Sequence, residues 1–141
     1  MGHGLEHTLE VAHKIALVLD IHHHWIRAEE YIQPNDDRVK KVIDSWRGVR
    51  PTLHYSYSRD EHLAVANLGD KTHSEMHDIK MLLERGCKKQ KLRAHSDLLP
   101  NRAVNDWALS FGEHFDIQTE AKGKNIAAEQ LYRQAVENSV I

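Results

Sequence analysis

The chain has 141 residues, of which 40% are hydrophobic and 28% are charged; these proportions are typical of one folded domain and exclude a disordered chain. A complete (β/α)8 barrel needs about 250 residues, so a single copy of this chain is too short to form one. The formal net charge of -2 excludes an overall basic surface, so any DNA partner would depend on local positive charge and on metal.

The sequence also argues against a membrane or disulfide-stabilised protein. The longest apolar run covers residues 15–19, which is too short to cross a membrane, and the N-terminus lacks the pattern of a signal peptide. The single cysteine, Cys87, has no partner for an intrachain disulfide. We therefore expect a cytoplasmic protein with no membrane partner.

The first half of the chain predicts a leading helix over residues 4–14 and a strand over 14–22. The strand is rich in Val, Ile and Leu, as is typical of a buried parallel strand. Residues 34–36 (Pro-Asn-Asp) provide a helix cap, and apolar residues recur at helical spacing from there to Trp46. A second strand is predicted over 51–57.

The second half repeats this alternation of helix and strand. A helix over 73–83 precedes a third strand over 90–96, a helix over 101–111 precedes a fourth strand over 115–121, and an amphipathic helix over 125–137 follows. Strands that alternate with helices indicate an α/β fold with a parallel sheet. We therefore predict one α/β domain spanning the chain, a leading helix plus four βα units, which is half of a (β/α)8 TIM-type barrel.

Each predicted strand ends in acidic or imidazole side chains, and such chemistry gathers at the carboxyl ends of parallel strands. In chain order these residues are Asp20 with His22–His24, His54, His95 with Asp97, and Glu120. Side-chain alternation places Asp20, His54, His95 and Glu120 on polar faces opposite mostly apolar ones. Polar side chains inside a barrel are costly unless they are paired or bound to metal. Mixed carboxylate and imidazole ligands suit Mn, Fe or Zn, so the pattern predicts a divalent metal site.

Each of these side chains also has a structural interpretation. A histidine on a strand is more often a structural residue than a ligand, and an acid at a strand end often caps the next helix. The run of three histidines could be a solvated loop. The recurrence of the pattern at four strand ends favours the metal site. Lys122 and Lys124 follow Glu120 at the same end and are candidates for phosphate contacts.

Four segments of the chain resemble the C-terminal half of UV-damage endonucleases in their order and separation. The segments are LVLDIHHHW, PTLHYSYSRDEHL, RAHSDLLP and FDIQTEAKGKN. The resemblance covers about residues 8–133, and its most specific parts are the Asp-x-x-His and Glu-Ala-Lys-x-Lys strand ends. It implies a metal-dependent barrel nuclease, related in fold to the apurinic endonuclease and xylose-isomerase-like group. It further implies incision of DNA immediately 5′ of a UV lesion, with up to three divalent ions.

The resemblance also implies roles for individual residues. Asp20, His54 and Glu120 would match three ligands of one metal, while His23 and His95 would match ligands of a second. Manganese is the expected metal, with zinc, iron or cobalt as other options. In clustered-metal hydrolysis one ion lowers the pKa of a bound water while its neighbours stabilise charge on the phosphate and leaving oxygen.

The chain departs from the family pattern at one ligand position. A chemically modified lysine of the family corresponds here to Thr52, two residues before His54. Asp97 could supply an oxygen ligand instead. Within the reaction centre we expect Glu120 and Lys122 to take part in catalysis, Lys122 through a phosphate contact.

The resemblance covers only the second half of the family's pattern, so we expect the lone chain to be incomplete. The remaining ligands would come from a homodimer or from a separately encoded N-terminal half, acting together on UV-damaged DNA. Two other functions stay open: a fragment of a xylose-isomerase-like sugar isomerase or epimerase, and a metal-binding remnant without catalysis. The acidic net charge favours the isomerase, whereas the segments HHHW and TEAKGK favour the nuclease.

Overall fold

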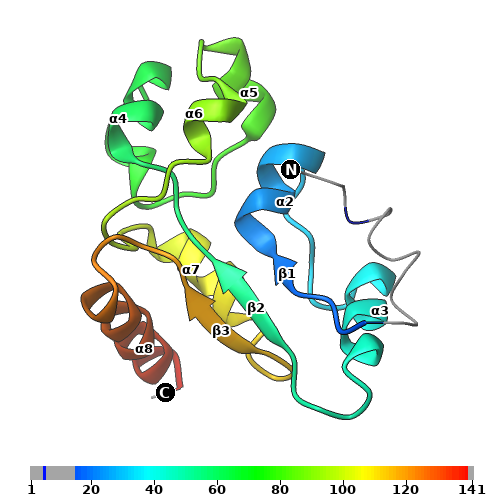
Figure 1. Ribbon diagram of the computed structural model, residues 1–141. Helices are drawn as coiled ribbons and strands as arrows, with labels where there is room; N and C mark the ends of the chain where they lie inside the picture. The colour runs from blue at the N-terminus through cyan, green and yellow to red at the C-terminus, as the bar shows by residue number, and fades with distance from the viewer. Residues whose placement is uncertain (1–4, 6–14, 140–141) are drawn as a thin grey trace.

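A parallel sheet of three short strands forms the centre of the computed structural model, which describes Leu5 and residues 15–139 (Figure 1). The strands are β1 (Leu19–Asp20), β2 (Thr52–Tyr55) and β3 (Asp116–Thr119), in the order β1-β2-β3. This arrangement confirms the predicted α/β class. The half barrel stays a prediction.

The register of the sheet aligns the carboxyl ends of the strands. Asp20 lies opposite His54 across β1 and β2, and His54 lies opposite Gln118 across β2 and β3. The backbone N–H of Glu120 donates to the carbonyl oxygen of Tyr55 at 2.8 Å, which extends the pairing of β3 by one residue. Acidic and imidazole side chains from three separate chain segments therefore lie together at the carboxyl ends of the strands.

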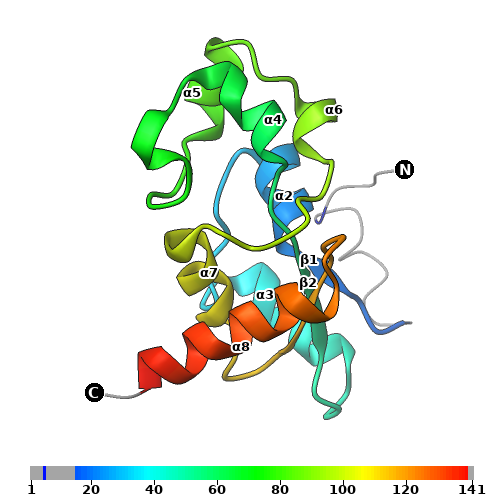
Figure 2. The same ribbon diagram turned by 90° about the vertical axis from the view of Figure 1, so that its left-hand side faces the viewer.

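Helices cover one face of the sheet and extend beyond its carboxyl ends. They are α2 (Ile21–Ala28), α3 (Asp37–Ser45), α4 (Asp60–Leu63), α5 (Ile79–Glu84), α6 (Lys89–Leu92), α7 (Arg102–Leu109) and α8 (Asn125–Ser139), with 3-10 turns at Ala64–Ala66 and Gly69–Thr72. Helices α3 and α7 lie on the covered face, and α8 packs beside β3 and α7 (Figure 2). Helices α4, α5 and α6 lie beyond the strand ends (Figure 1). No helix of residues 15–139 is long and apolar enough to cross a membrane.

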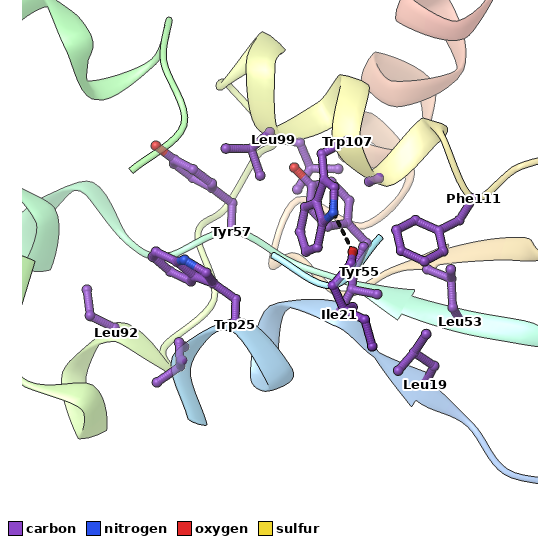
Figure 3. Packing of buried hydrophobic residues seen from close by; sticks show 14 of the residues in the cluster. Leu19, Ile21, Trp25, Leu53, Tyr55, Tyr57, Leu92, Leu99, Trp107 and Phe111 are labelled. Carbon is purple, nitrogen blue, oxygen red and sulfur yellow. Dashed lines mark hydrogen bonds between the residues drawn. The ribbon is translucent and has the colours of Figure 1, made fainter. Parts of the chain in front are cut away.

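The core lies between the sheet and the helices of its covered face. Leu53 and Tyr55 of β2 are fully buried, whereas Thr52 and His54 are partly exposed, as the predicted alternation requires. Trp107 of α7 packs edge-on against Phe111, with ring centroids 6.0 Å apart, and donates from Nε1 to the carbonyl oxygen of Ile32 at 2.8 Å (Figure 3). The apolar face therefore anchors the strands, and the polar face carries the functional candidates.

The first predicted strand, over residues 14–22, is shorter than expected. The structure has β1 at Leu19–Asp20, and helix α2 begins at the next residue, Ile21. The side chain of Asp20 caps this helix, because its Oδ1 accepts from the backbone N–H of His23 at 2.8 Å. The histidine run is therefore helical instead of extended.

The predicted third strand over residues 90–96 is wrong. Residues Lys89–Leu92 form helix α6, in keeping with the high helix propensity of Lys, Gln and Leu. His95 forms only an isolated antiparallel bridge with Ser58, just beyond β2. The described part of the chain therefore has three strands where the four predicted βα units required four.

The other predicted elements agree more closely with the structure. The strands over 51–57 and 115–121 appear as β2 and β3, and the helices ending near Trp46, over 101–111 and over 125–137 appear as α3, α7 and α8. The helix predicted over 73–83 begins only at Ile79, where Asp78 accepts from the N–H of Lys80 at 3.0 Å. The helix predicted over 4–14 lies outside the described residues, apart from Leu5.

Candidate metal centre

Three side chains meet at the carboxyl ends of the three strands. Asp20 ends β1, His54 lies in β2, and Glu120 follows β3 directly. Each offers one ligand atom, and these three atoms all lie within 4.8 Å of one another. We call this group the triad. Two carboxylates and one imidazole form a donor set suited to Mn, Fe or Zn, which the polar face predicted.

The triad is open to solvent on one side. The side chains of His54 and Glu120 are 30% and 33% exposed, and His54 Nδ1 lies 3.1 Å from Glu120 Oε1. Their neighbours on the opposite face, Leu53 and Tyr55, are buried and hold β2 in place. An ion or a phosphate can therefore reach ligand atoms that stand on a packed sheet.

The electrostatics of the triad fit a bound cation. The pKa of the Asp20 carboxyl is raised above its ordinary value, mainly by burial and further by the negative charge of Glu120. The backbone N–H of His23 and the charge of His54 act in the opposite direction. A divalent cation between the two carboxylates would offset both their repulsion and the cost of burying Asp20. The residues present therefore fit the ion.

His23 lies beside the triad without joining it. Its backbone N–H donates to the capping side chain of Asp20. Its own side chain lines a small cavity of about 100 Å³ together with Asp20 and Arg27. The next histidine, His24, is buried and bonded through Nε2 to Glu30 Oε2 at 2.8 Å, so it is a structural residue.

His95 and Asp97 face different cavities. His95 lines a pocket that Glu120 also lines, whereas Asp97 lines a separate one with Asp60 and His73. Among the described residues, the triad is the only group whose ligand atoms are close enough to hold one metal. A second metal at His23, His95 and Asp97 stays a prediction. The structure does not bring these three side chains into one group.

His22 is a structural residue that the sequence pattern did not distinguish from its neighbours. Its Nδ1 lies 2.9 Å from Ser56 Oγ, and its Nε2 lies 3.0 Å from Ser58 Oγ. Because Ser58 donates its proton to the carbonyl oxygen of Leu92, its oxygen accepts from Nε2–H of His22. Burial, with help from His95, lowers the pKa of His22 to about 3, so the ring is neutral. The spacing of Ser56 and Ser58 was the available signal.

Sequence reasoning also missed Arg59, which follows β2. It lines the pocket beside Glu120, together with Arg93, Lys122 and Lys124. Its position directly after the Ser-Tyr-Ser segment that follows β2 was the available signal.

Comparison with known proteins places the chain in a family. The family model described as UV-endonuclease UvdE matches residues 2–140, a range that contains the whole triad. No match was found among curated proteins, and none among solved structures. The family match confirms the resemblance to UV-damage endonucleases. The chain belongs to the UV-endonuclease UvdE family.

Proposed function

We propose that this chain carries the metal-binding part of an endonuclease that incises DNA immediately 5′ of UV lesions. The family match supports a function of the UV-damage endonuclease type. The observation that carries the proposal is the triad, in which Asp20, His54 and Glu120 converge within 4.8 Å at the open end of the sheet.

The triad residues would hold one divalent ion, with manganese as the metal we propose. When bound, such an ion supplies Lewis acidity to a phosphate oxygen and makes a water molecule more acidic. The chain itself positions the ligands. The helix cap fixes one oxygen of Asp20 against His23, and the pairing of Glu120 with Tyr55 fixes the backbone that carries the second carboxylate.

Lys122 is the residue that we propose to contact the phosphate. It lines the pocket that Glu120 also lines, and its backbone N–H donates to Ser96 at 3.3 Å. A lysine ammonium is a compact point charge that suits a phosphate oxygen. Replacing it with alanine should weaken incision without removing metal.

We further propose that the working enzyme contains residues beyond this chain, from a second copy or from a separately encoded half. Three protein ligands leave coordination positions open, as a catalytic site requires. In the described residues, β1 and β3 are the edge strands of the sheet, and an edge strand can pair with a strand of another chain. Light scattering at micromolar concentration should give a mass above that of one chain. A monomeric mass together with full activity would contradict this part of the proposal.

The function is tested by nicking of plasmid DNA. Purified protein with Mn²⁺ should convert UV-irradiated supercoiled plasmid to open circles and leave unirradiated plasmid supercoiled. His54→Ala should abolish nicking because it removes the central ligand, whereas Asp44→Asn, on the exposed side of α3, should not change it. Equal cutting of both plasmids, or none at protein concentrations where any dimer forms, would overturn the proposal.

A further inference from the structure

A positively charged pocket of about 540 Å³ lies directly beside the triad. Glu120 lines this pocket and also belongs to the triad, so the two sites share a wall. The cationic residues of the lining are Arg59, Arg93, Lys122 and Lys124. The volume falls within the range of about 300–1,000 Å³ that is typical of ligand pockets.

Four cationic side chains and one carboxylate, Glu120, line this pocket, so its charge is positive overall. Arg59 donates to Glu61 at 2.7 Å, and the charge of Lys122 helps to lower the pKa of Glu61. Across residues 15–139, no carboxylate forms an ion pair with Arg93, Lys122 or Lys124. Such a cluster on a chain with a net charge of -2 is a local exception, and it suits an anion.

The two loops that form the pocket are fastened to each other. The backbone N–H of Gly123 donates to the carbonyl oxygen of Asp97 at 2.7 Å. A Cβ at Gly123 would lie 2.3 Å from that oxygen and 2.9 Å from Leu98 Cδ2, so this approach requires glycine. The walls of the pocket are therefore held in a fixed relation before any ligand binds.

Lys124 occupies a position where its residue type is disfavoured for stability. Its φ of 41° lies in the left-handed region, which glycine adopts more easily. It also directly precedes helix α8, whose positive dipole end repels a cation and attracts an anion. Strain of this kind is characteristic of functional sites. Both features are explained if Lys124 serves an anionic ligand.

We propose that this pocket binds a backbone phosphate of the DNA strand, adjacent to the phosphodiester at the triad. The inference rests on the proposed function. Because Glu120 borders both sites, a strand that crosses the triad brings its neighbouring phosphate between the two loops. Arg93 offers a planar donor fork for two phosphate oxygens, and Lys124 adds a point charge.

The test measures DNA binding without catalysis. Wild type, Arg93→Ala and Lys124→Ala are titrated onto a fluorescently labelled, undamaged DNA duplex in the presence of chelator at several salt concentrations. Each variant should bind about three- to tenfold more weakly, and the slope of log affinity against log salt should fall by about 1. Lys41→Ala, on the exposed side of α3, is the matched control and should keep the wild-type slope. Wild-type slopes in both pocket variants would overturn the proposal.

Two further measurements separate the pocket from the triad. Gly123→Ala should weaken DNA binding in the same assay because the added Cβ forces the loops apart. Inorganic phosphate should displace the duplex only weakly; tight phosphate binding that leaves the duplex bound would overturn the assignment to DNA. If the wild type never nicks irradiated plasmid but the salt slopes change as expected, the pocket stands and the proposed function fails. If nicking occurs and the slopes do not change, only the pocket fails.

Discussion

The regions around His22 and His54 use the same type of side chain in opposite ways. His22 is buried in α2, and two serine hydroxyls bond both of its ring nitrogens. His54 is 30% exposed in β2, and one ring nitrogen lies 3.1 Å from a carboxylate oxygen of Glu120. A histidine whose two nitrogens are both bonded in the core cannot ligate a metal. One that stands between carboxylates at a strand end can.

This contrast also explains how the two regions depend on each other. His22 fastens α2 to the chain just beyond β2, and the residue before α2 is Asp20, the first member of the triad. The buried region therefore fixes the helix whose cap orients a ligand in the open region. Stability is concentrated around one histidine, and ligand chemistry around the other.

The largest effect is expected from removing charge at the open region. Asp20→Asn and Glu120→Gln should each weaken Mn²⁺ binding by at least about 100-fold, because even the loss of an outer partner of a ligand costs about 10- to 100-fold. Asparagine keeps the cap of α2, so Asp20→Asn should fold normally. Titration calorimetry gives the affinity, and thermal unfolding without metal gives the stability.

In the protein without metal, burial and the charge of Glu120 both disfavour the ionised form of Asp20, and its pKa is therefore raised. The melting temperature of metal-free Asp20→Asn should therefore equal or exceed that of the wild type. Asp44→Asn serves as the control for a lost negative charge elsewhere. Unchanged Mn²⁺ stoichiometry and affinity in both triad variants would leave Asp20 as a helix cap and end the comparison between the two histidines.

A smaller effect, on stability instead of metal binding, is expected from the buried region. His22→Phe leaves Ser56 and Ser58 without the imidazole and should lower the free energy of unfolding by about 1–3 kcal/mol. Mn²⁺ affinity should stay within about threefold of wild type. Urea unfolding and metal titration of the same sample measure the two quantities.

Ser56→Ala removes one of the same hydrogen bonds from the other partner, and it should cost about 1 kcal/mol. This second variant tests the same hydrogen bond if the bulkier phenylalanine of His22→Phe prevents folding. Loss of Mn²⁺ affinity at unchanged stability in either variant would show that His22 belongs to the metal site, against the structure.

The strand pattern predicted that Asp20, His54 and Glu120 lie among the polar side chains at the strand ends, and the family resemblance implied that these three share one metal. Alternation along β2 puts His54 on the other face of the strand from Leu53. Parallel pairing brings the carboxyl ends of the strands together. Alternation acts within a few residues, and parallel pairing follows from the regular succession of strands and helices along the chain. The apolar face of the core was predictable for the same reason, as the burial of Tyr55 illustrates.

The rest of the site depends on how loops pack, which no local pattern encodes. The segment from Lys89 to Leu92 has too few apolar residues to distinguish a strand from a helix, so the third strand was predicted wrongly. That error placed Asp97 on the same face as His95, whereas the two residues line different cavities. His22 was grouped with its neighbours because a helix that begins at Ile21 does not follow strand alternation.

A third histidine, His77, gives the finest test of the comparison. It is buried, and its Nε2 lies 2.9 Å from Tyr57 Oη and 3.1 Å from the carbonyl oxygen of Thr72. Burial lowers its pKa below the ordinary value of 6.5, His73 adds to this effect, and the Thr72 carbonyl and Glu75 oppose it. The hydroxyl oxygen of Tyr31 accepts a hydrogen bond from the backbone N–H of His77.

Because the folded-state pKa of His77 is lowered, its contribution to stability is complete above the unfolded pKa of about 6.5 and is lost as the pH falls. His77→Gln keeps a donor near Thr72 but does not titrate. The difference in free energy of unfolding between wild type and His77→Gln should therefore shrink from pH 7.5 to pH 5.5. Urea unfolding of both proteins at the two pH values measures it, and other titrating groups cancel in the difference. A difference that does not change with pH would mean that burial alone does not make a histidine of this chain structural, and it would weaken the same argument for His22.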